Sequence, residues 1–126
     1  MHRSIKLPKK SIKSFVLRAG KMTTRQTHGL HHLLANYLLP QSERIWDFAS
    51  IFANSNPVIV EIGFGMGASL FEMAKKRPEY NFVGIEVHLA GLGSLAADLA
   101  DGHLTNVRLA NFDAMQAFAE NIADAS

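Results

Sequence analysis

The chain of 126 residues contains no cysteine, which excludes disulfides and thiolate metal sites and makes the reducing cytoplasm its natural setting. No apolar run approaches the roughly 18 to 20 residues that a membrane-spanning helix needs. The basic beginning of the chain lacks the apolar segment and cleavage site of a secretory signal. Composition therefore predicts a cytoplasmic globular protein that does not enter a membrane.

Acidic residues are missing from the first 42 positions, although these carry eight of the 13 lysines and arginines (Arg3, Lys6, Lys9, Lys10, Lys13, Arg18, Lys21 and Arg25). The remaining positions carry five basic and eleven acidic residues. A basic arm on an acidic body favours a polyanionic partner. A solvated, disordered tail accounts for the same charges, and charge by itself does not separate the two interpretations.

Three regions follow from the pattern along the chain. Residues 1–22 are predicted to be a basic flexible arm, and 23–56 a helical N-terminal segment. Thr23 with Gln26 forms a capping-box pattern, and leucines and a tyrosine then recur at helical spacing as far as Leu38, before Pro40. Residues 44–52 predict a short second helix. Residues 57–126 are predicted to be a partial domain of alternating strands and helices.

In that domain, strands are predicted at 58–62, 82–87 and 106–110. The first is a β-branched apolar run, typical of a strand buried on both faces. Apolar stripes predict helices after each strand, the third marked by Met115, Phe118 and Ile122. This alternation of strands and helices indicates an α/β fold, in which a parallel sheet is joined by right-handed crossover helices.

The pattern stops after three strands, which leaves the outer edge of the first strand without a neighbour. An exposed apolar edge promotes aggregation. The simplest expectation is that the chain is the N-terminal portion of a larger protein. A covering partner chain, or the N-terminal helix folded over that edge, would serve as well.

The stretch "IVEIGFGMGASLFEMA" places three glycines, Gly63, Gly65 and Gly67, between the first strand and its helix. A turn of this kind binds nucleotide-type ligands at a helix N-terminus. With Ala68 the spacing also fits a dinucleotide fingerprint. Glu61 favours the other choice, because its carboxylate would repel a pyrophosphate and suits the ammonium group of S-adenosylmethionine.

Polar residues also follow the other two strands. Glu86 is placed to accept hydrogen bonds from both ribose hydroxyls of either cofactor. Asp113 is placed to bind an adenine amino group, and Asn111 to order the loop. His88 either contacts the ligand or shields the loop. Helix caps and solvated loop acids are the structural alternative for these residues.

His28, His31 and His32 share adjoining helical positions, but no cysteine or acid lies near them in the sequence. No metal site is therefore predicted.

Four stretches together resemble the bacterial tRNA (guanine-N7-)-methyltransferase family: "SFVLRAGKMT", "VIVEIGFGMGASLFEMA", "NFVGIEVHLAGLG" and "LTNVRLANFDA". The similarity is clear over residues 12–26 and 57–118, and loose over 27–56. The combination of "EIGFGMG" with "GIEVH" is more specific than a glycine motif.

The resemblance implies a Rossmann-like class I methyltransferase fold, here incomplete, with the first three βα units and an N-terminal basic helical segment. It implies S-adenosylmethionine held by Glu61, Glu86, Asp113 and the glycine turn. It also implies tRNA as substrate. Together with the charge distribution, this makes basic residues of the N-terminal region the expected RNA contacts, namely Lys13, Arg18, Lys21 and Arg25. The family's Pro-Asp-Pro-Trp stretch is absent. Catalytic residues are therefore expected beyond residue 126, and the fragment by itself is expected to be inactive.

Two other functions stay open at this point. A nucleotide-dependent dehydrogenase domain would share the glycine turn, although Glu61 argues against it. A non-catalytic RNA-binding fragment, or an inactive paralogue, would keep the fold and the basic arm without chemistry.

Overall fold

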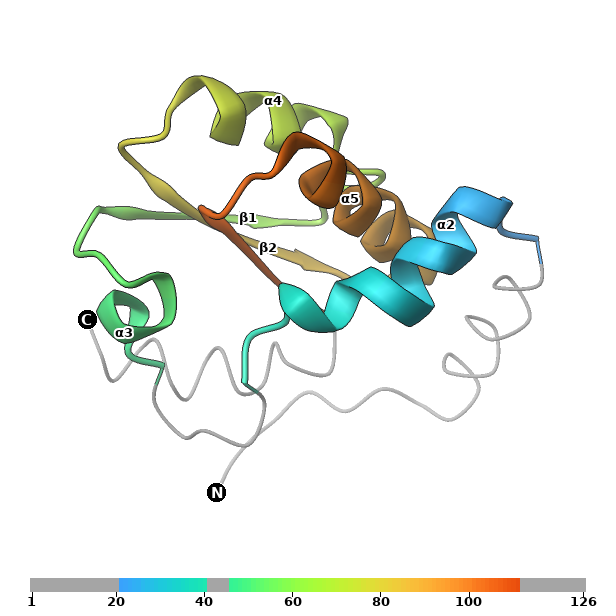
Figure 1. The fold of residues 1–126 in the computed structure, drawn as a ribbon, viewed down its shortest axis with the longest axis horizontal. Helices are drawn as coiled ribbons and strands as arrows, with labels where there is room; N and C mark the ends of the chain where they lie inside the picture. The colour runs from blue at the N-terminus through green and yellow to red at the C-terminus, as the bar shows by residue number, and fades with distance from the viewer. Residues whose placement is uncertain (1–20, 41–45, 112–126) are drawn as a thin grey trace.

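The computed structural model describes residues 21–40 and 46–111. Its centre is a parallel sheet in the order β1-β2-β3, formed by β1 (Val58–Ile62), β2 (Asn81–Glu86) and β3 (Val107–Asn111). The crossover helices are α4 (Ala68–Lys76) and α5 (Leu89–Gly102). Figure 1 shows these elements in their alternating sequence. The predicted α/β fold is confirmed, and the predicted third helix lies outside the described residues.

The central strand of the sheet is β2, whose six residues are all buried. The prediction that 58–62 is buried on both faces is wrong for this structure. Among the described strands β1 lies at the edge, and the side chains of Ile59 and Ile62 are 37% and 56% exposed. An apolar run indicates that a strand is at least partly buried. How much of the strand is buried depends on its position in the strand order of the sheet.

The larger core lies between the sheet and the helices α4 and α5. Its buried members include Leu70 and Ala74 of α4, Phe82 of β2 and the apolar stripe of α5 (Leu92, Leu95, Ala96 and Leu99). Leucines three and four positions apart place that stripe on one helix face, which is why α5 packs along the sheet.

The N-terminal helical segment lies along α5, as Figure 1 shows. It begins as α2 (Thr24–His28) and continues through the π-helical η1 (Gly29–Leu33) and the 3-10 turn η2 (Leu34–Asn36). The predicted capping box is confirmed: Thr23 Oγ1 accepts from the Gln26 N–H, and Gln26 Oε1 accepts from the Thr23 N–H. A Cβ on Gly29 would collide with the carbonyl of Gly93, so glycine permits this close crossing.

The same segment then pairs with the sheet at β3. Leu38 forms a parallel bridge with Leu109, so the helix predicted to reach Leu38 ends at Asn36. This edge is opposite to β1, and the alternative that the N-terminal helix covers β1 is therefore wrong.

A smaller core occupies the other face of the sheet. Its buried residues are Leu39, Trp46, Phe52, Val83, Ile85 and Ala110. The helix predicted at 44–52 is α3 (Phe48–Phe52), capped by Asp47, which accepts from the Ser50 N–H. Among the described helices, none is long and apolar enough to span a membrane.

Candidate functional site

The strand register brings three of the predicted site residues to one face of the sheet. Glu61 is paired with Gly84, and Glu86 with Asn111. Because side chains alternate along a strand, Glu86 shares the face of Gly84, two residues earlier. That face is the one under α4 and α5, since a Cβ on Gly84 would meet Phe64 and Leu70. Glu61, Glu86 and Asn111 therefore approach the carboxyl edge on a common face; Asp113 lies outside the described residues.

The glycine turn follows β1 at this edge. Gly63, Gly65 and Gly67 have φ angles of 76°, 67° and 89°, a conformation that side chains disfavour. Within the part of the chain that the structure describes, a Cβ on Gly63 or Gly65 would have no heavy atom within 4 Å, whereas one on Gly67 would meet Leu95. The backbone of the first two glycines therefore faces open space that a ligand can enter, and the third packs against α5.

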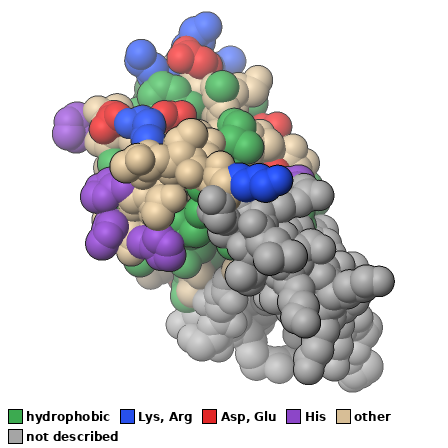
Figure 2. Space-filling view, turned by 90° about the vertical axis from the view of Figure 1, so that its right-hand side faces the viewer, with side chains coloured by type: hydrophobic (Ala, Val, Ile, Leu, Met, Phe, Trp, Pro, Cys, Tyr) green, Lys and Arg blue, Asp and Glu red, His purple; other side chains and the backbone are tan. Residues whose placement is uncertain are grey.

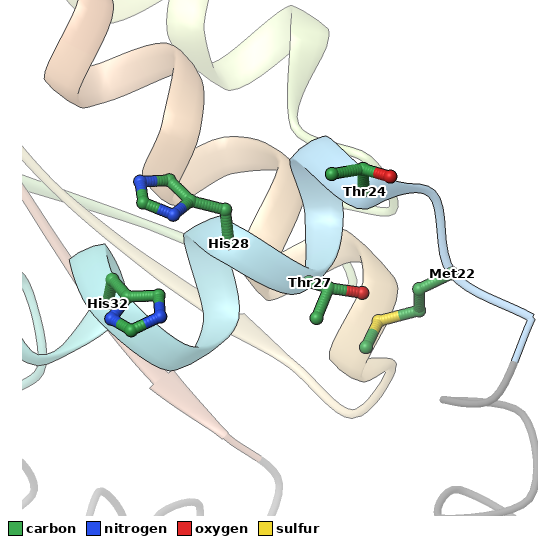
Figure 3. Close-up of a pocket in the computed structure, with 5 residues that line it drawn as sticks. All are labelled: Met22, Thr24, Thr27, His28 and His32. Carbon is green, nitrogen blue, oxygen red and sulfur yellow. The ribbon is translucent and has the colours of Figure 1, made fainter.

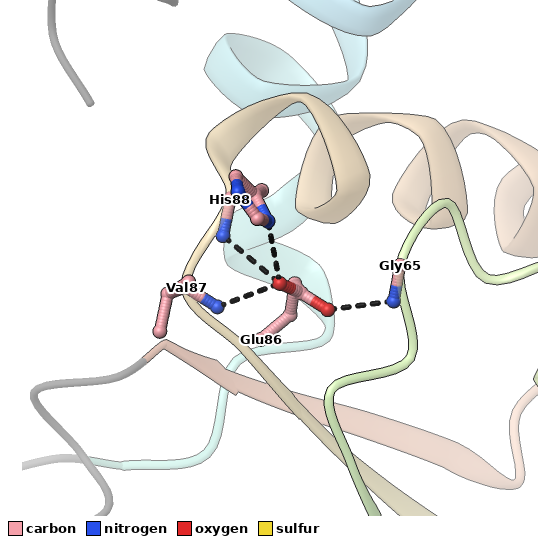
Figure 4. A network of polar contacts seen from close by, with 4 residues as sticks. All are labelled: Gly65, Glu86, Val87 and His88. Carbon is pink, nitrogen blue, oxygen red and sulfur yellow. Dashed lines mark hydrogen bonds and ion pairs between the residues drawn. The ribbon is translucent and has the colours of Figure 1, made fainter. Parts of the chain in front are cut away.

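Glu86 is only 5% exposed and accepts hydrogen bonds on both carboxylate oxygens (Figure 4). The Gly65 N–H donates to Oε1, with the nitrogen 2.6 Å away. The N–H groups of Val87 and His88 donate to Oε2 at 3.0 and 3.2 Å, and His88 Nδ1 lies 3.0 Å from the same oxygen. The acid thus ties the glycine turn to the loop that begins α5.

These contacts keep the carboxylate charged. Burial by itself raises the pKa of Glu86, but the hydrogen bonds from Gly65, His88 and Val87 favour the ionised form, and the net pKa is below the ordinary value of 4.5. At neutral pH Glu86 is an acceptor only. With three donors on Oε2 and one on Oε1, the remaining acceptor position is on Oε1.

Glu61 is half-buried on β1, and no described residue donates a hydrogen bond to it or forms an ion pair with it. It is therefore a carboxylate beside the open side of the turn whose acceptor positions a cationic ligand can use.

Gly91, at the beginning of α5, belongs to this site although it was not among the predicted residues. A Cβ there would collide with the Gly65 carbonyl oxygen and approach Glu86 Cγ. The signal was in the sequence: a glycine in the first turn of an apolar helix costs about 1 kcal/mol against alanine, so it indicates close packing.

Of the predicted RNA contacts, Lys13 and Arg18 lie outside the described residues, and Lys21 is exposed. Arg25 donates to Asp98 and forms a second ion pair with Asp101, each at 2.8 Å, and thereby joins α2 to α5. Its side chain remains 52% exposed.

A hollow of about 330 Å³ on α2 is lined by Met22, Thr24, Thr27, His28 and His32 (Figure 3). The rings of His28 and His32 are 5.0 Å apart, and Figure 2 shows histidines gathered on this side of the molecule. Within residues 21–40 and 46–111, no three potential ligands among His, Asp and Glu lie close enough to hold a metal ion. None of the predicted cofactor residues lines this hollow.

The chain is similar to known methyltransferases. A family described as "Putative methyltransferase" matches residues 55–126. The chain is 45% identical over 119 residues to a tRNA (guanine-N(7)-)-methyltransferase of Stutzerimonas stutzeri, covering 94% of this chain and 50% of that protein. It is 48% identical over 119 residues to the protein of the same description from Legionella pneumophila, covering 93% and 53%.

A solved structure of an antibiotic-related methyltransferase aligns with a TM-score of 0.47 and 20% identity, over 57% of this chain and 36% of that one. The chain spans about half the length of the curated relatives it matches. Since the family match covers more than half of its residues, this chain belongs to that family of methyltransferases.

Proposed function

We propose that this chain is the cofactor-binding part of a tRNA (guanine-N7-)-methyltransferase that moves a methyl group from S-adenosylmethionine to N7 of a tRNA guanosine. The observation that carries the proposal is the match of 93–94% of the chain to proteins of that description. The acidic edge of the sheet supports it, because the residues found there suit this cofactor better than a dinucleotide.

The described residues fit S-adenosylmethionine at three points. Gly63 and Gly65 present backbone to open space, as close approach of a ligand requires. Glu61 supplies a negative charge for the ammonium group of the methionine moiety. Glu86 has an acceptor position on Oε1 for one ribose hydroxyl; a second hydroxyl would have to displace the Gly65 N–H. Asn111 and Asp113 are proposed at the adenine end.

Little chemistry is then required of side chains. S-adenosylmethionine, when bound, supplies a methyl group on a positively charged sulfur. Guanine N7 has a free lone pair at neutral pH, so no residue has to remove a proton from it. The residues of this chain bind and orient the donor, and alignment of donor with acceptor can supply most of the rate. No catalytic residue is assigned within the chain.

The RNA is proposed to meet the basic N-terminal region through phosphate contacts from Lys13, Arg18, Lys21 and Arg25. Lys21 is exposed, and Arg25 keeps about half of its side chain in solvent while it pairs with α5. A cytoplasmic setting, where tRNA is found, goes with this partner.

Calorimetry on the full-length protein tests the cofactor assignment with S-adenosylmethionine and NAD as separate ligands. We expect S-adenosylmethionine to bind and NAD to give no signal, because Glu61 repels a pyrophosphate. Glu86→Ala should weaken binding by about 1.5 to 3 kcal/mol, the value of a hydrogen bond to a charged acceptor.

Glu79→Ala is the matched control. Among the described residues Glu79 forms its ion pair with Arg77, on the surface, so its replacement should leave the affinity unchanged. NAD binding without S-adenosylmethionine binding would reject the proposal. Unchanged affinity in Glu86→Ala would remove Glu86 from the site.

A further inference from the structure

The two oxygens of the Glu86 carboxylate have different surroundings. Among the described residues, two main-chain N–H groups and the His88 ring contact Oε2, whereas Oε1 accepts from the Gly65 N–H alone. The main-chain donors belong to the next two residues and follow from the local path of the chain. The His88 ring is the side-chain donor among the three, so it is the donor that depends on which residue occupies position 88.

The state of the ring follows from its partner. An ionised carboxylate only accepts, so Nδ1 must carry a proton whether the ring is neutral or charged. Glu86 is 5% exposed, while the His88 side chain is 46% exposed and lies against it. The contact between a buried acceptor and a partly solvated ring fixes the carboxylate from its outer side (Figure 4).

We infer that His88 is a positioning residue: by donating from Nδ1 to Oε2 of Glu86, it holds the carboxylate so that Oε1 faces the glycine turn and is presented to a ribose hydroxyl of the methyl donor. This inference rests on the proposed function. His88 itself is assigned no contact with the ligand; it acts through Glu86.

The physical reason is preorganisation. A carboxylate on a flexible side chain pays in entropy when it is fixed on binding, and a hydrogen bond made before binding lowers that cost. Without the ring, Oε2 keeps its two main-chain donors, so the fold should persist while the carboxylate gains freedom to turn.

The test measures binding of S-adenosylhomocysteine and of its 2′,3′-dideoxy analogue to the full-length protein. His88→Ala should bind S-adenosylhomocysteine about tenfold more weakly, by analogy with the lower end of the loss in metal affinity when a residue that orients a metal ligand is removed. The wild type and His88→Ala should bind the dideoxy analogue with equal affinity, because that analogue has no ribose hydroxyl to donate to Glu86. His88→Asn should restore affinity, since its amide nitrogen is attached to Cγ as Nδ1 is.

His31→Ala, an exposed histidine on η1, is the control and should match the wild type with both ligands. If His88→Ala weakens both ligands equally, or neither, or if His88→Asn fails to restore affinity, the positioning role is rejected while the proposed function stands. If the wild type binds neither ligand, the proposed function is rejected and the inference with it. Should His88→Ala not fold, His88→Gln, with its amide one bond farther out, is the second loss variant and is judged by the same comparison.

Discussion

Glu86 is a buried carboxylate that accepts four hydrogen bonds from the protein itself. Glu86 holds the glycine turn through Oε1 and the start of α5 through Oε2. Burying a charge is unfavourable unless such partners compensate it. These contacts therefore contribute to the folded state, and under the proposed function they also orient the carboxylate that would accept a hydrogen bond from the ligand.

Stability should fall with acid through this residue. The pKa of Glu86 is lowered on folding, so its contribution is present above the ordinary value of 4.5 and is lost as pH falls through the lower folded value. We expect Glu86→Gln to be less stable than the wild type at pH 7, and the gap to narrow below about pH 4.5. Urea unfolding of both proteins between pH 7 and pH 2.5 measures this.

Glu79→Gln serves as control. The pKa of Glu79 is also lowered, by the hydrogen bond from Arg77, but both side chains are more than half exposed and solvent screens the pair. The difference in unfolding free energy between Glu79→Gln and the wild type should be small at every pH. If the difference for Glu86→Gln is the same at every pH, Glu86 is not the source of the acid dependence.

Helix α5 and the glycine turn pack directly against each other, so the position of each constrains the other. The first turn of α5 carries Gly91 against the Gly65 carbonyl, and further along the helix Leu95 packs on Gly67. The position of the turn is thus set by the helix that follows the next strand, as well as by β1, from which the turn departs.

Gly91→Ala should disturb both stability and binding. The added methyl group would collide with the Gly65 carbonyl oxygen, so the turn has to move away from Glu86. Overpacking of this kind costs about 1 to 3 kcal/mol of unfolding free energy. Chemical denaturation, with S-adenosylhomocysteine binding measured alongside, tests the expectation.

Gly102→Ala, at the other end of α5, provides the comparison. The heavy atoms nearest to its methyl group would be those of the Phe71 ring, at 3.0 Å, and of the Leu104 side chain. A side chain can shift where a main-chain carbonyl cannot. We expect this variant to bind like the wild type. Equal losses in the two variants would mean that glycine in α5 matters for the helix itself and not for the turn.

Charge is distributed unevenly over the whole molecule. The first 42 residues carry no acid, and the rest carry more acidic than basic residues. If the proposed RNA partner is correct, the basic arm contributes affinity that is independent of sequence and falls with salt.

Deleting residues 1–13 should flatten the salt dependence of RNA affinity. The deletion removes five cations, and each one that contacts a phosphate contributes roughly 0.7 to 0.9 to the slope of log affinity against log salt. Titration of tRNA at several salt concentrations measures the slope.

Lys75 and Lys76, exposed in the last turn of α4, supply the control. They lie away from the glycine turn, because α4 begins at that turn and runs towards the amino ends of the strands. Their replacement by alanine should leave the slope unchanged. If the deletion leaves it unchanged as well, the arm is a solvated tail.

Local patterns in the sequence were enough to place the three strands and the beginning of the first described helix. Apolar runs placed β1, β2 and β3 to within one residue, and Thr23 with Gln26 located the beginning of α2. These signals are local, because hydrophobic period and capping depend on residues a few positions apart. The family resemblance, carried by the stretches around the glycine turn and Glu86, is confirmed by the comparisons. The division at residues 22 and 56, and the roles of the site residues, stay predictions.

Contacts between residues far apart in the chain could not be predicted from spacing. Among the described strands β1 lies at the edge of the sheet, Leu38 pairs with Leu109, and Glu86 accepts a hydrogen bond from the Gly65 N–H. An apolar residue is equally suited to a central strand or an edge strand. A carboxylate can accept a hydrogen bond from any donor that the fold brings near it. Strand order and helix packing select among these, because they fix which distant groups meet and which face water.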